Sequence, residues 1–215
     1  MNLETTYLKN NKVYLSGTVF RAPEYSHELY GEGFHEFILE VPRLSRQCDY
    51  IPITVSERLM QDIDLTVGAQ VALNGQFRSY NKMENNRSKL MLTVFVRDFA
   101  TAEEGKNPNT VELSGYICKD PIYRTTPFNR EICDILLAVN RAYNKSDYIP
   151  CIAWGRNARF VRDIAVGQHI SVYGRIQSRE YTKKLSDTES EVRIAYELSV
   201  GRIVCGENDV AEDKE

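Results

Sequence analysis

Hydrophobic and polar residues alternate along much of this chain, the pattern expected of β-strands that bury one face. Val13, Leu15 and Val19 are separated by polar residues, and the alternation returns at residues 111–117. It also predicts second strands near residues 37–41 and 135–139, and third strands over the two Tyr-Ile-Pro segments. Each half of the chain therefore reads as a succession of half-buried strands.

One short helix is expected to interrupt the strands of each half. In "NARFVRDI" (157–164), Val161 and Ile164 are spaced to share one helical face. The segments that follow, "HISVYGRIQSREY" (169–181) and "VRIAYELSV" (192–200), predict a long fourth strand and a fifth. Gly17 and Gly115 interrupt the two first strands, where we expect a bulge or tight bend.

The chain repeats itself. The tetrapeptide Asp-Tyr-Ile-Pro stands at 49–52 and again at 147–150, and "NKVYLSGTVFRAPEY" aligns with "NTVELSGYICKDPIY". A polar segment, "TAEEGKNPN", separates the copies. We predict two domains, 1–105 and 106–205, followed by a short acidic disordered tail, 206–215.

Five strands with a helix between the third and the fourth are the strand count and helix placement of an OB-fold. The fold class predicted is therefore all-β, as two tandem OB-fold five-stranded barrels. The repeated Asp49 and Asp147 stand next to strand starts, where capping of a turn is the ordinary role of aspartate.

Several classes of protein do not fit the sequence. No apolar run approaches the ~20 residues that span a bilayer, and the N-terminus lacks an apolar segment of signal-peptide length, so a cytoplasmic location is expected. The five cysteines form no Cys-x-x-Cys pair and the three histidines are scattered, which predicts reduced thiols, no metal and no cofactor. With no nucleophile signature or phosphate-binding loop, we expect no enzyme activity.

The period of two in the strands assigns side chains to faces. From 148 to 154, Ile149, Cys151 and Ala153 form an inward set, and Tyr148, Pro150, Ile152 and Trp154 an outward one. In the fourth strand the outward set is Tyr173, Arg175, Gln177, Arg179 and Tyr181. Aromatic rings stack on bases and arginine neutralises phosphate, so this face is typical of single-strand binding. The plainer alternative is that tyrosine is frequent because it suits strands, and that a second sheet or subunit covers this face.

Charge agrees only weakly with nucleic-acid binding. The net charge is −3. Residues 109–203 nevertheless hold 14 basic and 11 acidic side chains, so the half that contains Trp154 is mildly basic.

The second half resembles the bacterial single-stranded DNA-binding protein family. The resemblance rests on "NTVELSGYICKDPIYR", "DILLAVNRAY" and "DYIPCIAWGRNARFVRDIAVGQHISVYGRIQSREYT". It implies that base stacking falls on Tyr143, Tyr148, Trp154 and Tyr181. Because the family includes chains with two OB-folds that pair, the resemblance also implies a homodimer with four folds.

The first half retains less of this chemistry. Ser56 stands where the second half has Trp154, and Ser45 stands where it has Tyr143. Tyr50, Arg78, Tyr80 and Lys82 remain as candidate contacts of a weaker, diverged copy. The acidic tail ends in charge, unlike the apolar tip that is usual in the family, so recruitment of partners through it is in doubt.

The function predicted is sequence-independent binding and protection of single-stranded DNA in replication, recombination or repair, with RNA as a possible ligand. The alternative is a tandem OB adaptor or replication-restart accessory protein whose outward faces bind protein. Salt dependence separates the two, because phosphate neutralisation makes binding weaken steeply with salt.

Overall fold

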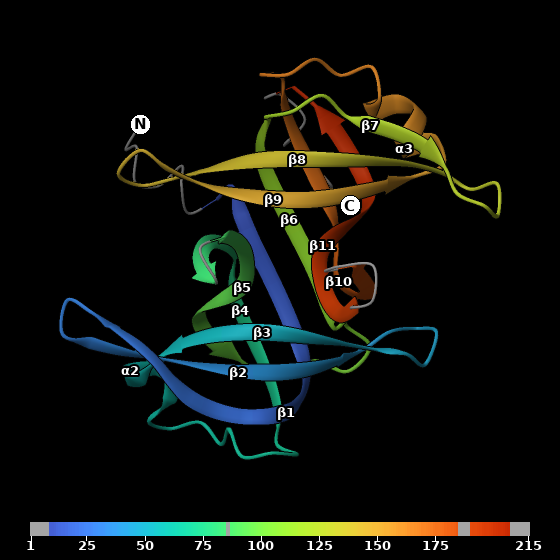
Figure 1. Ribbon diagram of the computed structural model, residues 1–215. Helices are drawn as coiled ribbons and strands as arrows, with labels where there is room; N and C mark the ends of the chain where they lie inside the picture. The colour runs from blue at the N-terminus through green and yellow to red at the C-terminus, as the bar shows by residue number, and fades with distance from the viewer. Residues whose placement is uncertain (1–8, 85–86, 185–189, 207–215) are drawn as a thin grey trace, which may run out of the picture.

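The computed structural model describes residues 9–84, 87–184 and 190–206, and the predicted tail lies almost wholly outside them. The first half forms the lower part of Figure 1 and the second half the upper part. The elements of the first half are β1 (Asn11–Leu29), β2 (Glu32–Pro42), β3 (Cys48–Ser56), α2 (Glu57–Met60), β4 (Gln70–Glu84) and β5 (Arg87–Ala100). Those of the second are β6 (Asn109–Ile117), β7 (Ile122–Thr125), β8 (Glu131–Arg141), β9 (Lys145–Trp154), α3 (Arg156–Val161), β10 (His169–Lys184) and β11 (Ser190–Cys205).

Each half closes into a barrel of the predicted kind. The strands follow one another in the order β2-β3-β5-β4-β1-β6-β10-β11-β9-β8-β7, and further pairings of β2 with β1 and of β8 with β6 close the two ends. The helices α2 and α3 lie between the third and fourth strands of their barrels. The prediction of two tandem OB-fold barrels is confirmed.

The halves differ in their first strand. In the first half β1 runs unbroken through 19 residues, whereas the second half divides the same stretch into β6 and the short β7. The break at residues 118–121 ends with Pro121, which has no N–H to give to a ladder. β7 pairs with β8, just as the far part of β1 pairs with β2.

The two strand glycines serve barrel closure. A Cβ on Gly17 would overlap the carbonyl oxygen of Glu40 in β2, and one on Gly115 would overlap that of Ala138 in β8. These are the points where the first strand of each barrel approaches the second. The backbones can approach this closely only without a side chain. The expected bulge is absent at both glycines, because β1 pairs with β4, and β6 with β10, through them without a shift of register.

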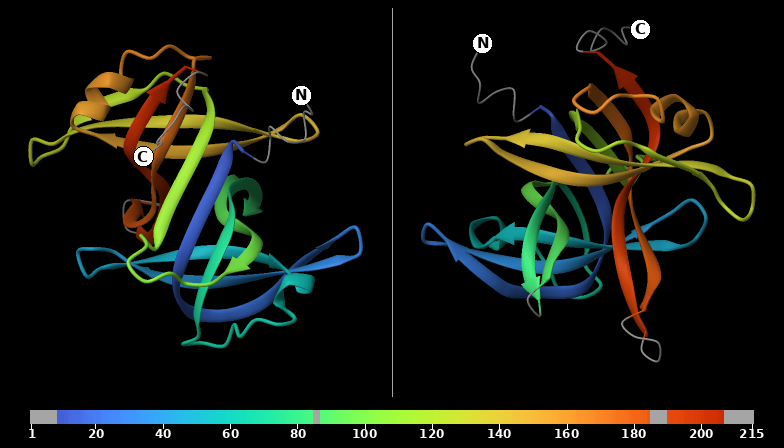
Figure 2. Two further views of the ribbon diagram at one scale, coloured as in Figure 1. Left: turned by 180° about the vertical axis from the view of Figure 1, so that it is seen from behind. Right: turned by 45° about the horizontal axis from the view of Figure 1, so that its top comes forward.

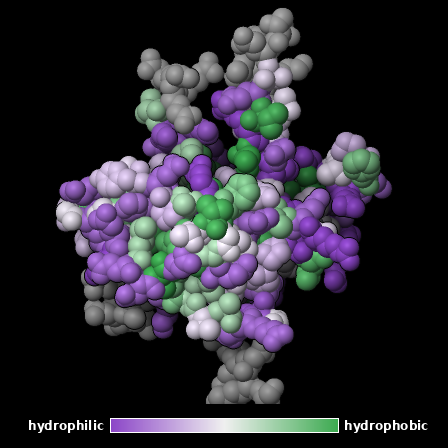
Figure 3. Space-filling model, turned by 90° about the horizontal axis from the view of Figure 1, so that it is seen from below, coloured by the Kyte–Doolittle hydropathy of each residue, from purple (hydrophilic) through white to green (hydrophobic). Residues whose placement is uncertain are grey.

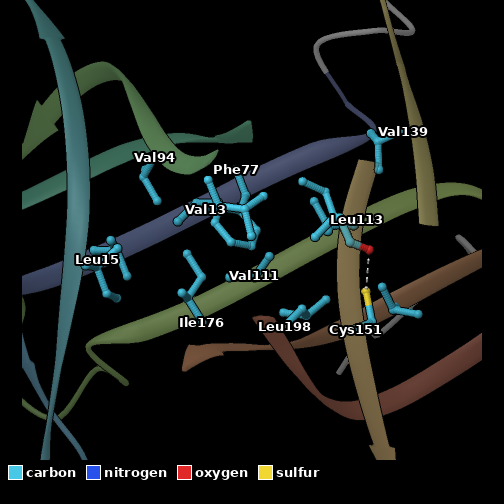
Figure 4. Packing of buried hydrophobic residues seen from close by; sticks show 14 of the residues in the cluster. Val13, Leu15, Phe77, Val94, Val111, Leu113, Val139, Cys151, Ile176 and Leu198 are labelled. Carbon is cyan, nitrogen blue, oxygen red and sulfur yellow. Dashed lines mark hydrogen bonds between the residues drawn. The ribbon is translucent and has the colours of Figure 1, made fainter. Parts of the chain in front are cut away.

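The halves are joined through their first strands. β1 and β6 pair antiparallel, with Val13 opposite Val111, and the two strands cross the middle of the molecule side by side (Figures 1 and 2). Val13 and Phe77 of the first half lie close to Val111 and Ile176 of the second (Figure 4). One hydrophobic core therefore runs through both barrels.

The repeated aspartates join the halves and do not cap turns, so that interpretation was wrong. Asp49 is buried, and its Oδ1 accepts hydrogen bonds from the Ser178 backbone N–H (2.7 Å) and hydroxyl (3.1 Å) in the other half. Asp147 is buried too, and its Oδ1 accepts from the Ser79 backbone N–H at 2.7 Å. The Asp-Tyr-Ile-Pro repeat thus places one carboxylate at each of two related contacts between halves.

The cysteines of the chain are unpaired, and its described helices are short. All five cysteines are free thiols, and burial raises the pKa of the Cys133 thiol to about 11, which keeps it protonated and unreactive. Among the described residues, no helix is both long and apolar enough to cross a membrane.

Candidate nucleic-acid interface

A groove of about 390 Å³ opens on the outer face of the second half, and we call it the Trp154 groove. Its walls come from β7, β8, β9, β10 and β11, and from the turn between β2 and β3 of the first half. The groove is lined by Arg43, Arg124, Thr126, Ile132, Ile152, Trp154, Gln177, Ser178, Arg179 and Glu197. It therefore combines apolar surface with three arginines.

The pairing of β8 with β9 builds the apolar part of the groove. Trp154 lies opposite Ile132 and is 37% exposed, while Ile132 itself is buried. Gly155 follows at once with a φ of +52° and donates its N–H to the Glu131 carbonyl at 2.9 Å, so the chain turns away directly after the indole. An exposed aromatic edge beside buried isoleucines is suited to stacking.

The predicted inward set of β9 is confirmed, since Ile149, Cys151 and Ala153 are all buried. On the outward side, Ile152 is only 4% exposed although its period-two position is correct. It lies in the lining of the groove between neighbouring strands, where the walls shield it from water.

The arginines of the groove are held by carboxylates. Arg124 donates from Nε to Asp134 Oδ2 at 2.8 Å. Arg179 is 55% exposed and lies 3.8 Å from Glu197, whose Oε1 accepts a 2.7 Å hydrogen bond from Gln177. Because its ion pair is long and open to solvent, Arg179 is the groove arginine that a phosphate could engage with the smallest loss of existing contacts.

Arg43 enters the groove from the other half. Its Nε donates to Asp49 Oδ2 at 2.7 Å, a second donor binds Asp49 Oδ1, and Nη2 also donates to the Ser178 carbonyl at 3.0 Å. The hydrogen bond that Arg43 donates to Asp49 raises the pKa of Arg43. Asp49 thus fixes this guanidinium against β10.

Arg175, a predicted contact, shares the same carboxylate. Its Nη1 lies 3.2 Å from Asp49 Oδ2. Burial, the largest cause, lowers the pKa of Arg175, although the charge of Asp49 opposes the shift. Arg175 lies at the contact between halves and is outside the lining of the Trp154 groove.

The other predicted aromatics of the second half lie outside the lining of the groove. Tyr143 is 91% exposed at the turn between β8 and β9, with a φ of +62°. Tyr148 is exposed on β9, and its N–H donates to the Ser79 hydroxyl at 2.7 Å. Tyr181 is exposed opposite Arg193 on the β10–β11 hairpin, and Tyr173 packs against Arg202, 4.7 Å from its ring centre.

The corresponding face of the first half has its tyrosines turned toward acids. Tyr50 donates from its hydroxyl to Glu40 at 3.2 Å and packs against Phe20, with ring centres 4.6 Å apart. The Tyr80 hydroxyl lies 3.5 Å from Glu36. A phosphate brought to these rings would meet a carboxylate, which opposes nucleic-acid binding. Lys82 is exposed two residues beyond Tyr80.

Arg78 and Ser56 are enclosed on that face. The Arg78 guanidinium stands 4.1 Å from the centre of the Phe95 ring, and its Nε is buried without a partner. Burial, aided by the charge of Arg141, lowers the pKa of Arg78 to about 10. Ser56, at the position of Trp154, is buried at the start of α2. Seen from below, the first half mixes hydrophobic and hydrophilic residues (Figure 3).

Sequence reasoning missed Arg43 and Arg124. Arg124 could have been found, because it ends the quoted "DPIYR" segment and lies on the strand opposite β8. Arg43 carries no such signal, since nothing in the spacing of the chain places the β2–β3 turn against β10 of the other half.

The family match falls on the second half of the chain, the half that contains Trp154. The model of the single-strand binding protein family matches residues 108–203. Single-stranded DNA-binding protein 1 of Staphylococcus aureus (strain COL) is 39% identical over 80 residues, which are 34% of this chain and 48% of that protein. The chain therefore matches about half the length of that curated relative.

Solved structures extend the likeness of fold to both halves. The wild-type single-stranded DNA binding protein from Thermus aquaticus has a TM-score of 0.72 and 20% identity, covering 95% of this chain and 96% of that one. The dimeric N-terminal domain of PriB protein from Thermoanaerobacter tencongensis is 54% identical and covers 45% of this chain and 100% of that one, with a TM-score of 0.39. Residues 108–203 are therefore a domain of the single-strand binding protein family, carried by a chain of two tandem OB-folds.

Proposed function

We propose that this chain binds single-stranded DNA without sequence preference and protects it during replication, recombination or repair, without catalysing a reaction. The observation that carries the proposal is the Trp154 groove, where an exposed indole lies among three arginines in the half that matches the family. The indole would stack on a base while the arginines meet phosphates. Single-stranded RNA offers the same groups, so we treat it as a variant ligand of this same function.

We also propose that the chain forms a homodimer and acts in the cytoplasm. A homodimer would present four OB-folds to one strand, and the cytoplasm is where such a ligand is met in a bacterial cell. Within the chain we assign the main binding to the second half and an auxiliary part to the first, because the tyrosines of the first half face Glu36 and Glu40.

A protein-binding role is the second candidate, and the same acidic face favours it. Tyr50 and Tyr80 hold carboxylates on an OB-fold surface whose Arg78 is enclosed, an arrangement better matched to a basic protein than to DNA. In this reading the chain is a tandem OB adaptor or a replication-restart accessory protein.

Titration of the full chain with oligo-dT at two salt concentrations tests the proposal. We expect quenching of Trp154 fluorescence and an affinity that falls steeply with salt, with a log–log slope of about −0.7 for each phosphate contact on a single strand. A duplex of the same length, bound more weakly, is the control. Absence of binding at low salt would leave the adaptor role as the better proposal.

A further inference from the structure

We propose that Arg43, in the first half, is a single-stranded DNA contact of the Trp154 groove in the second half. The inference rests on the proposed function and adds to it that the binding site is shared between the halves. Arg43 lies in the turn between β2 and β3 and lines the groove together with Trp154 and Arg179.

The turn itself is built to hold this position. The Arg43 N–H donates to the Gln47 carbonyl at 2.8 Å, and the Arg46 N–H donates to the Arg43 carbonyl at 3.1 Å, which closes the hairpin tip. Two guanidinium donors then bind Asp49, and Nη2 also binds the Ser178 carbonyl of β10. Fixed on both sides, the guanidinium loses little freedom when a ligand arrives.

The contact between the halves carries an excess of positive charge that can attract a phosphate. Arg43 and Arg175 share the single carboxylate of Asp49. The pair of arginines therefore exceeds its counter-ion by one positive charge next to the groove. Arg43 binds the carbonyl of Ser178, the residue before Arg179 on β10. A phosphate lying between Arg43 and Arg179 would offset this excess.

The course of a bound strand follows from the positions of these groups. A base stacked on Trp154 would lie at the β9 wall, with the backbone passing Arg179 and Ser178 toward the β2–β3 turn of the other half. Leu44, next to Arg43, projects fully into solvent there and could contact the following base. A bound strand would then contact both halves, on either side of the Asp49 contact.

Matched variants of the full chain test the inference. Arg43→Gln keeps a donor for Asp49 but removes the charge, and we expect oligo-dT affinity to fall about tenfold and the salt slope to shrink by about 0.7. Arg46→Gln removes the same charge from the exposed end of the same turn and should change affinity less than twofold. Arg43→Lys should retain the wild-type salt slope.

The outcomes separate this inference from the proposed function. Equal losses in Arg43→Gln and Arg46→Gln would reduce Arg43 to a general charge and overturn the inference, while wild-type binding would still support the function. Failure of the wild-type chain to bind oligo-dT would overturn both. Photo-crosslinking of the wild-type chain to oligo-dT carrying 4-thiothymine needs no variant. We expect crosslinks within residues 43–47, and crosslinks confined to the second half would count against a shared site.

Discussion

At the scale of single residues, the halves differ by what surrounds each equivalent position. Trp154 stands at the rim of a groove, whereas the equivalent Ser56 is buried at a helix start. Arg179 keeps a loose ion pair at 3.8 Å, whereas the equivalent Tyr80 places its hydroxyl 3.5 Å from Glu36. Duplication preserved the backbone positions, and exchange of single side chains opened one face and closed the other.

The first prediction concerns Trp154. Replacement by Ala should weaken oligo-dT binding by about 1–3 kcal/mol, the usual contribution of one stacked base. The melting temperature should change little, because a third of the side chain already faces solvent and the core lies on the other side of β9. Trp154→Phe, which keeps a ring, should retain most of the affinity. Affinity unchanged in Trp154→Ala would remove the indole from the site.

A second residue-scale prediction uses the pH dependence of Asp147. Burial raises the pKa of this carboxyl above its ordinary value of 3.8, so the folded state holds the proton more tightly than the unfolded state. The stability that this gives is fully present below pH 3.8 and is lost as pH rises through the raised pKa. Relative to Asp147→Asn, wild type should therefore be comparatively more stable at pH 4 than at pH 7.

Urea unfolding of both proteins at these two pH values measures the effect. The Asn variant keeps an oxygen for the Ser79 N–H but cannot ionise, so subtracting its stability isolates the titration of Asp147. A difference that moved in wild type's favour as pH rises would show that the charge of Arg141, 3.5 Å away, outweighs burial.

At the scale of elements, β10 carries two arginines with different tasks. Arg175 and Arg179 have the same parity, but Arg175 is bound to Asp49 of the other half and Arg179 is open to the groove. Alternation along one strand could not separate them, because the division depends on which part of β10 faces the first half.

This division gives an element-scale prediction. Arg175→Ala should lower the free energy of unfolding, because it takes a partner from the buried Asp49. Arg179→Ala should leave stability almost unchanged, reduce oligo-dT affinity equally on dT and mixed sequence, and decrease the salt slope by about 0.7. Thermal melts and two-salt titrations distinguish the variants. A selective loss on one sequence would indicate base-edge readout.

At the scale of the whole molecule, the halves resemble two subunits joined in one chain. The β1–β6 pairing places Val13 opposite Val111, which are equivalent residues of the repeat, so an approximate two-fold axis passes between them. The paired Asp49 and Asp147 contacts obey the same symmetry. The interface between the barrels is therefore self-complementary in its backbone.

Fragments test this arrangement. A fragment of residues 106–205 holds all strands of its barrel, so we expect it to fold, but removal of β1 leaves β6 as a free edge. It should therefore associate with a second copy through β6, with Val111 near the axis, and light scattering should report a dimer. A strictly monomeric, fully stable fragment would contradict the role given to the shared core.

The same fragments compare the two binding faces. Residues 106–205 should bind oligo-dT more tightly than residues 1–105, whose tyrosines hold Glu40 and Glu36. Filter binding at matched salt measures both. The full chain should exceed either fragment, because linked sites raise the effective concentration of each contact. Equal binding by the two fragments would argue against the aromatic contrast between halves.

The sequence by itself determined the strands, the inward set of β9 and the duplication, because these depend on local alternation and on self-similarity. It also pointed to Trp154 and Arg179 through parity. Only the tertiary structure decided that Asp49 holds Arg43 and Arg175, and that Arg43 reaches the groove of the other half. The physical reason is that alternation reports which face of a strand a residue occupies. The partner that covers that face is set by the β1–β6 register, which brings together residues more than a hundred positions apart.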